Sequence, residues 1–258
     1  MRDILTLVGK DLKNSFHKKF FLLLIFLLLF QLWFIAGSGS VEQVQKSGEL
    51  SYMAAVFSFN FFGSIVALAL NYNGVSAERE SKIMDMILMS GISKRKVYFG
   101  KICTGVLVSA VFAVLYSTAI AAFYLVLSGD FMISLQALRY IIPITVFLMI
   151  FNGLGLVLSV AMRSSKASLI ICIIVGALMM PRLFVSIIDG ISSIIGLSEA
   201  VIERIYLLSP ALILNSLNGY SDTNTVLWGL LLFAIYVIGS MVTGICIFQK
   251  QDELNYGE

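Results

Sequence analysis

Long runs of hydrophobic residues, separated by short polar segments, dominate this sequence. Six of the runs come close to the roughly 20 residues that an α-helix needs to cross the hydrocarbon core of a bilayer. These runs are 20–36, 53–72, 102–127, 140–162, 167–188 and 226–248. The pattern predicts an all-α integral membrane protein, with six transmembrane helices that form a single transmembrane domain over residues 1–258.

The residues before the first run, 1–19, predict an amphipathic helix. Leu5, Val8, Leu12 and Phe16 recur at spacings of three and four residues and therefore share one helix face. Such a helix rests in the membrane interface, where neighbouring lysines reach anionic headgroups. A cleaved signal peptide is the alternative, but the basic segment and the apolar run after it are both longer than signal peptides favour.

Residues 189–225, between the last two runs, are too apolar for a plain loop. We expect two short helices here, on the outer side and partly re-entrant into the membrane. The first covers 198–208, where apolar and acidic side chains fall on different faces. The second covers 209–219, where Ser209 suits an N-cap and Gly219 suits a C-terminal stop.

A charged segment follows the second run and predicts a cytoplasmic helix over 76–91. Ser76 suits the N-cap, and Gly91 suits the C-terminal stop. Residues 86–89 of this helix are four consecutive apolar side chains, which need a surface to bury them. That surface is either the chain's own span ends and the membrane, or a hydrophobic groove on a cytoplasmic partner.

Composition and charge place the chain in a membrane. Hydrophobic residues make up 59% of it and charged residues 13%, whereas soluble domains have about 45–50% and about 25%. Most of the 18 lysines and arginines lie in segments on the same side of the membrane as the N-terminus. The positive-inside rule therefore predicts a multi-pass protein of the cell membrane with both termini in the cytoplasm.

Candidate catalytic and metal-binding residues are sparse. Cys103, Cys172 and Cys246 lie in apolar runs without CxxC spacing, so we interpret them as small buried hydrophobes. The single histidine, His17, has no partner cluster, and the sequence has no GxxxxGK[ST] phosphate-binding loop. We expect a transport subunit rather than an enzyme, with no metal site, no cofactor of its own and no nucleic-acid partner.

Some residues are candidates for lining a transport pathway. Arg182 follows Pro181, where we expect the fifth run to break and the chain to turn toward the outer interface. An arginine at that place either snorkels to the interface or lines the pathway. Ordinary helix packing is the alternative for the other four candidates, which are Phe59, Asn60, Ser64 and Phe112.

Three short motifs accompany the predicted helices, namely Glu78-Arg79-Glu80 after the second run, Gly100-Lys101 before the third and Leu208-Ser209-Pro210 before the sixth. Their order, together with the six runs, resembles the permease subunits of ABC-2 type transporters over nearly the whole chain. In that family an ERE run is usually followed by Gly-Thr, an acidic residue, two leucines and Ser/Thr-Pro. Here Lys82-Ile83 replaces Gly-Thr and Gly91 replaces the proline, which leaves the subfamily and the substrate open.

The resemblance implies that 76–91 is a coupling helix, seated in a cleft of a separate ATP-binding subunit. It also implies two such subunits, which hold ATP and Mg²⁺, and a second permease chain that we expect to be identical, all surrounded by membrane lipids. The residues implied to contact the ATP-binding subunit are Glu78, Arg79, Glu80, Asp85, Met86, Ile87, Leu88, Met89 and Ser90.

The implied function is ATP-driven export. The spans are rich in Phe and Leu and poor in charge, which favours an amphipathic or hydrophobic cargo, and an exporter of amphipathic or antimicrobial peptides is our preferred interpretation. An ABC permease for lipid, glycan, drug or sodium export is an alternative. A secondary transporter driven by an ion gradient is another, and it predicts ionisable residues or broken helices within the spans. An intramembrane enzyme or a non-transporting scaffold is a third.

Overall fold

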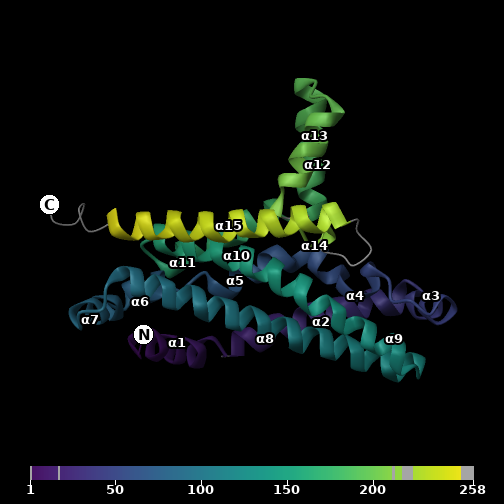
Figure 1. The fold of residues 1–258 in the computed structure, drawn as a ribbon, viewed down its shortest axis with the longest axis horizontal. Helices are drawn as coiled ribbons and strands as arrows, with labels where there is room; N and C mark the ends of the chain where they lie inside the picture. The colour runs from purple at the N-terminus through teal and green to yellow at the C-terminus, as the bar shows by residue number, and fades with distance from the viewer. Residues whose placement is uncertain (1, 17, 211–212, 217–222, 251–258) are drawn as a thin grey trace.

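The computed structural model describes residues 2–16, 18–210, 213–216 and 223–250. Every regular element in these ranges is a helix, which confirms the all-α prediction. The longest helices run side by side along the length of the molecule, and one pair of shorter helices projects away from this bundle (Figure 1).

Among the described residues, five helical segments are long and apolar enough to cross a membrane, and a bent pair of helices adds a sixth when the pair is counted as one span. The five are built on α2 (Lys18–Gly37), α4–η1–α5 (Tyr52–Ser58, Phe59–Gly63 and Ser64–Asn71), α8 (Lys94–Ser128), α10 (Ile141–Ala161) and α15 (Thr223–Lys250). The short helices α3 (Ser40–Ser47) and α9 (Phe131–Gln136) lie at one end of the bundle. We call the other end, where α7 (Ile83–Met89) lies, the α7 end (Figure 1).

The second span is not a continuous α-helix. It contains a π-helical turn, η1, and a non-helical residue, Val56, just before it. The side chain of Gln31 on α2 compensates for the break, because it donates to the carbonyl of Ala54 at 2.8 Å and accepts from the backbone N–H of Ser58 at 2.8 Å. A backbone break at membrane depth is tolerated when protein groups satisfy the freed hydrogen bonds in this way.

The N-terminal helix α1 (Arg2–Ser15) packs along α8 rather than lying apart from the bundle. Its buried side chains are Leu7, Val8 and Asp11, whereas Leu5 is exposed. The buried face therefore includes Val8 of the predicted apolar face, with Leu12 and Phe16 half-buried, but it is turned away from Leu5. The physical reason is Asp11, whose carboxylate turns toward the bundle to meet a lysine of α8.

The fifth hydrophobic run is two helices, α11 (Ser165–Leu178) and α12 (Pro181–Ile195), bent by 67°. The break falls at residues 179–180, as predicted, and Pro181 takes the first position of α12, where a helix does not need its N–H. The fifth run at 167–188 is therefore a broken span, with its break at the predicted place.

The segment after α12 partly matches its prediction. α13 (Glu199–Leu208) agrees with the helix expected over 198–208, and it projects from the bundle together with α12 (Figure 1). The helix expected over 209–219 stays a prediction, because positions 211–212 and 217–219 lie outside the described residues. Within the described part, α14 covers Ile213–Ser216.

The helix expected over 76–91 is also two helices, α6 (Ser76–Glu80) and α7. They are separated at Lys82, which has φ 57° and is the one non-glycine residue with positive φ among the described residues. Side chains rarely adopt this left-handed conformation, which costs roughly 1–2 kcal/mol. Lys82 stands where the family pattern has glycine. The predicted stop at Gly91 is confirmed, since α7 ends at Met89 and Gly91 has φ 82°.

Candidate functional site

The start of α6 is held by another helix rather than by its own cap. The backbone N–H groups of Val75 and Ser76 both donate to the hydroxyl oxygen of Ser159 on α10, at 3.0 Å each. The first N–H groups of a helix have no partner within it. Ser159 therefore supplies the acceptor that the sequence assigned to Ser76, and it fixes α6 against α10.

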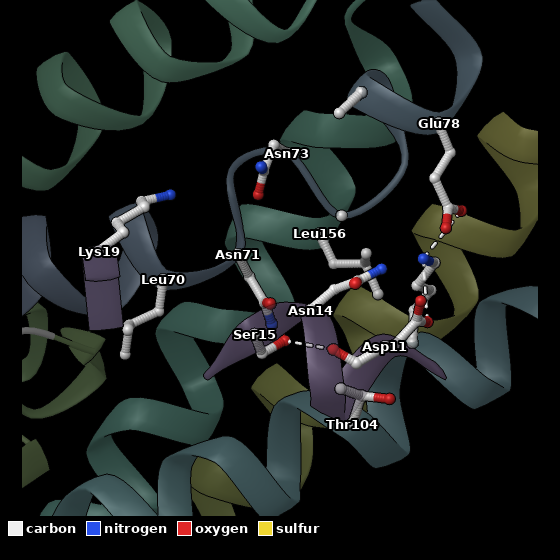
Figure 2. A pocket seen from close by; sticks show the side chains of 13 residues that line it. Asp11, Asn14, Ser15, Lys19, Leu70, Asn71, Asn73, Glu78, Thr104 and Leu156 are labelled. Carbon is white, nitrogen blue, oxygen red and sulfur yellow. Dashed lines mark hydrogen bonds and ion pairs between the residues drawn. The ribbon is translucent and has the colours of Figure 1, made fainter. Parts of the chain in front are cut away.

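Glu78, the first residue of the ERE run, points to α8 and α1. One carboxylate oxygen lies 2.8 Å from the ammonium of Lys101 on α8, and the other lies 3.4 Å from the ammonium of Lys10 on α1. The Lys101 ammonium also lies 2.9 Å from a carboxylate oxygen of Asp11 on α1. Lys101 thus joins α8, α6 and α1. Figure 2 marks its ion pairs with the carboxylates of Asp11 and Glu78 as dashed lines.

This ionic cluster of Lys101, Asp11 and Glu78 is largely buried within the chain. Lys101 is 8% exposed and Asp11 is 7% exposed. Burial raises the pKa of Asp11 above its ordinary value, and the ammonium of Lys101 only partly opposes this effect. Buried charges are expensive unless they are paired, so both carboxylates depend on the ammonium of Lys101.

Arg79 caps the C-terminal end of α10. Its guanidinium donates to the carbonyl oxygens of Val160, at 3.0 Å, and Met162, at 3.3 Å. The last carbonyls of a helix lack partners within it, and an arginine both satisfies them and suits the negative end of the helix dipole.

Glu80 meets the opposite kind of helix end. One of its carboxylate oxygens accepts a hydrogen bond from the backbone N–H of Ser165, the first residue of α11, at 3.1 Å. Negative charge is favourable at a helix N-terminus. The three consecutive side chains of the ERE run therefore connect α6 to four other helices: α8 and α1 through Glu78, α10 through Arg79 and α11 through Glu80.

α7 carries one buried and one exposed face. Met84 is buried in a small hydrophobic cluster with Val97, Tyr98 and Phe248, and Ile87 and Leu88 pack against its edge. Met86 and Met89 point away from the chain and are 62% and 86% exposed. Asp85 and Ser90 are exposed as well. Part of the predicted contact face thus packs on the chain itself, and the exposed part is carried by two methionines.

The four candidate pathway residues in the spans are buried within the chain. Phe59 packs edge-on against Tyr116, and the aromatic ring of Phe112 packs edge-on against Phe20. The side chain of Asn60 accepts a hydrogen bond from the hydroxyl of Tyr52 at 3.1 Å. The hydroxyl of Ser64 donates to the carbonyl of Gly176 at 2.7 Å and joins α5 to α11.

Arg182, the fifth pathway candidate, is exposed on α12. Its guanidinium carbon lies 5.2 Å from the ring centroid of Phe61, a cation–π distance.

Sequence reasoning missed the ionic cluster. The resemblance implied that Glu78 contacts the ATP-binding subunit and gave Lys101 only as part of a motif, whereas the structure pairs the two side chains and buries Lys101 within α8. The signal that pointed to it was Gly100-Lys101 itself, a charge placed directly before an apolar run. The sequence did not indicate Asp11 as the partner of Lys101, because it is one acidic residue among several lysines.

Comparison with known proteins agrees with this architecture. The sequence profile of the ABC-2 family transporter proteins matches residues 5–253 of the 258 in the chain. The chain belongs to the ABC-2 transporter family. As an ABC-2 protein it is a multi-pass membrane subunit of an ABC transporter, and the family implies an ATP-binding partner. No curated protein matches the sequence.

Family membership bears on the alternative of an ion-gradient transporter. The structure does contain what that alternative predicts, namely a broken second span and buried ionisable groups. In this ABC-2 protein, however, the break is filled by Gln31, and the buried charges pair with one another at the α7 end.

Proposed function

We propose that this chain is the permease of an ATP-driven exporter, and that α6 and α7 form the coupling segment that contacts its ATP-binding subunit. The observation that carries this proposal is the two-sided arrangement of α7, with Met84 buried and Met86 and Met89 exposed. Flexible methionines suit a contact that repacks during a cycle, and an apolar helix face suits a hydrophobic groove.

The ERE run would transmit the movement of α7 to the spans. A displacement of α7 pulls on α6, and Glu78, Arg79 and Glu80 connect α6 to α8, α10 and α11 by charged contacts of 2.8–3.1 Å at their shortest. Charged hydrogen bonds are about twice as strong as neutral ones. The same three residues, which the family resemblance assigned to the ATP-binding subunit, thus serve inside the chain as the link between coupling segment and spans.

The assembly we propose contains two copies of this chain and two ATP-binding subunits. ATP and Mg²⁺ belong to the latter, because this sequence has no phosphate-binding loop. The α7 end, with its basic residues such as Arg95 and Lys96, faces the cytoplasm of the cell, and both termini lie on that side. The projecting α12–α13 pair exposes Ile194 and Ile195 for contact with lipid or with the second copy.

The cargo we propose is amphipathic or hydrophobic, with an amphipathic peptide as the preferred class. The support for this cargo is the apolar character of the spans. Over the whole chain, 59% of the residues are hydrophobic and 13% are charged.

Aspartate substitution on α7 tests the coupling assignment. Met86→Asp and Met89→Asp should each reduce co-purification of the ATP-binding subunit while the amount of chain in the membrane stays unchanged, because both side chains are exposed. Met132→Asp, at an equally exposed methionine on α9 at the opposite end, is the control and should retain the subunit. Undiminished co-purification with both α7 variants would overturn the proposal.

A further inference from the structure

A polar cavity of about 280 Å³ lies beside the ionic cluster at the α7 end. Its walls come from α1, the first turn of α2, the turn between α5 and α6, and α8 (Figure 2). Most of the side chains that line it are polar or charged, which is unusual for a chain this apolar. It is partly enclosed and larger than the space one water needs.

Several hydrogen-bond donors around this cavity have no partner within the part of the chain that the structure describes. The side-chain amides of Asn14, Asn71 and Asn73 line it, and none of them forms a hydrogen bond with another described residue. The ammonium of Lys19 also lines it. It lies 3.6 Å from the ring centroid of Tyr72 and has no carboxylate partner among the described residues. Lys19, Asn71 and Asn73 are partly buried, whereas Asn14 is exposed. Polar groups that are withdrawn from bulk water normally find partners.

The cavity lies beside the ends of two apolar spans. Lys19 is in the first turn of α2, and Asn71 is the last residue of α5, so both stand where an apolar span begins or ends. Figure 2 shows Lys19 on one side of the cavity and Asp11 and Glu78 on the other. The second side has two carboxylates for one buried ammonium, that of Lys101. The Lys19 side of the cavity therefore attracts an anionic group, whereas the side with Asp11 and Glu78 repels any further negative charge.

We propose that this cavity binds a single phosphate group, with Lys19 as its ionic contact and the three asparagine amides as hydrogen-bond donors. A phospholipid headgroup and a soluble phosphate share this chemistry, and basic pockets at the cytoplasmic side of membrane proteins bind lipid headgroups. The carboxylates opposite Lys19 favour a headgroup that adds an amine to one phosphate, as phosphatidylethanolamine does, over a polyanionic one. This inference does not depend on the cargo or on the ATP-binding subunit.

Native mass spectrometry of the purified full-length chain tests the site, with phosphatidylethanolamine, phosphatidylglycerol and inorganic phosphate in separate arms. Wild type should retain phosphatidylethanolamine, and Lys19→Gln should bind it about tenfold more weakly, since one charged contact is lost. Lys18→Gln, at the exposed neighbouring lysine, is the matched control and should bind as wild type does. Lys19→Arg keeps the charge and should retain most of the binding.

A second variant covers the case in which Lys19→Gln fails to fold. Asn14 is exposed on α1 while its side chain lines the cavity, so Asn14→Asp should fold and weaken binding through charge repulsion. Binding of inorganic phosphate alone, with the same dependence on Lys19, would support the site and identify its source as soluble. The proposal would be overturned if wild type, Lys19→Gln and Asn14→Asp bound each of the three ligands equally. The cavity would then be interpreted as a water-filled space.

Discussion

The ammonium nitrogen of Lys101 lies 2.8 Å from a carboxylate oxygen of Glu78. The carboxylate of Asp11 lies 2.9 Å from the same nitrogen. One cation on the third span therefore holds both the N-terminal helix and the segment that leads to α7. Breaking a buried ionic group by removing one member leaves the others without compensation, which costs more than the intact group contributes.

Removal of Lys101 should destabilise the chain strongly. Lys101→Met keeps the length of the side chain but leaves two buried carboxylates, and we expect a loss of about 3–5 kcal/mol, measured by thermal or denaturant unfolding in detergent. The control is Lys10→Met, since Lys10 is 42% exposed in its pair with Glu78 and surface pairs contribute about 1 kcal/mol or less. Combining Lys101→Met with Asp11→Asn and Glu78→Gln should restore part of the loss. Equal effects of the two lysine substitutions would contradict the assignment of a buried cluster.

Glycine at position 82 should stabilise the chain. Lys82 has φ 57°, and a residue with a Cβ atom pays roughly 1–2 kcal/mol in this conformation, whereas glycine does not. Lys82→Gly should raise the unfolding free energy by about 1 kcal/mol, and Lys82→Ala should leave it within about 0.5 kcal/mol of wild type. A fall in stability with glycine would show that α6 and α7 are not separated by a left-handed residue.

The stability of the chain should depend on pH through Asp11. Burial raises the pKa of this carboxyl, so the folded chain holds its proton more tightly than the unfolded chain does. Wild type should therefore gain stability relative to Asp11→Asn as the pH falls from about 7 to about 4, because only wild type takes up this proton. The melting temperatures of the two proteins at several pH values provide the measurement, and a difference that stays constant with pH would refute the raised pKa.

The spans were predictable because hydrophobic length is a local property of the sequence. The runs at 20–36 and 102–127 became α2 and α8 with extensions at their ends. The stop at Gly91 and the break before Pro181 were also predictable, since glycine and proline act on their own backbone.

The contacts that define the candidate site were not predictable from one sequence, because they join residues far apart in the chain. Asp11 and Lys101 are separated by 90 positions, and nothing local distinguishes Asp11 from a solvated acidic residue. The sequence alone gives no reason for a glutamine at position 31, within an apolar run. The structure explains it, because the side chain of Gln31 binds the backbone groups freed by the break in the second span. The division of 76–91 into two helices falls at Lys82, which lies between α6, held by contacts to other helices, and the buried Met84 of α7.

The most direct test of the central claim is site-specific photo-crosslinking in membranes that contain the ATP-binding subunit. A benzoylphenylalanine placed at Met86 or Met89 of α7 should crosslink to that subunit, whereas the same group at Met132, exposed at the opposite end of the bundle, should not. Crosslinks from α7 only to lipid or to this chain itself, in membranes where the transporter is assembled, would contradict the coupling role of α6 and α7.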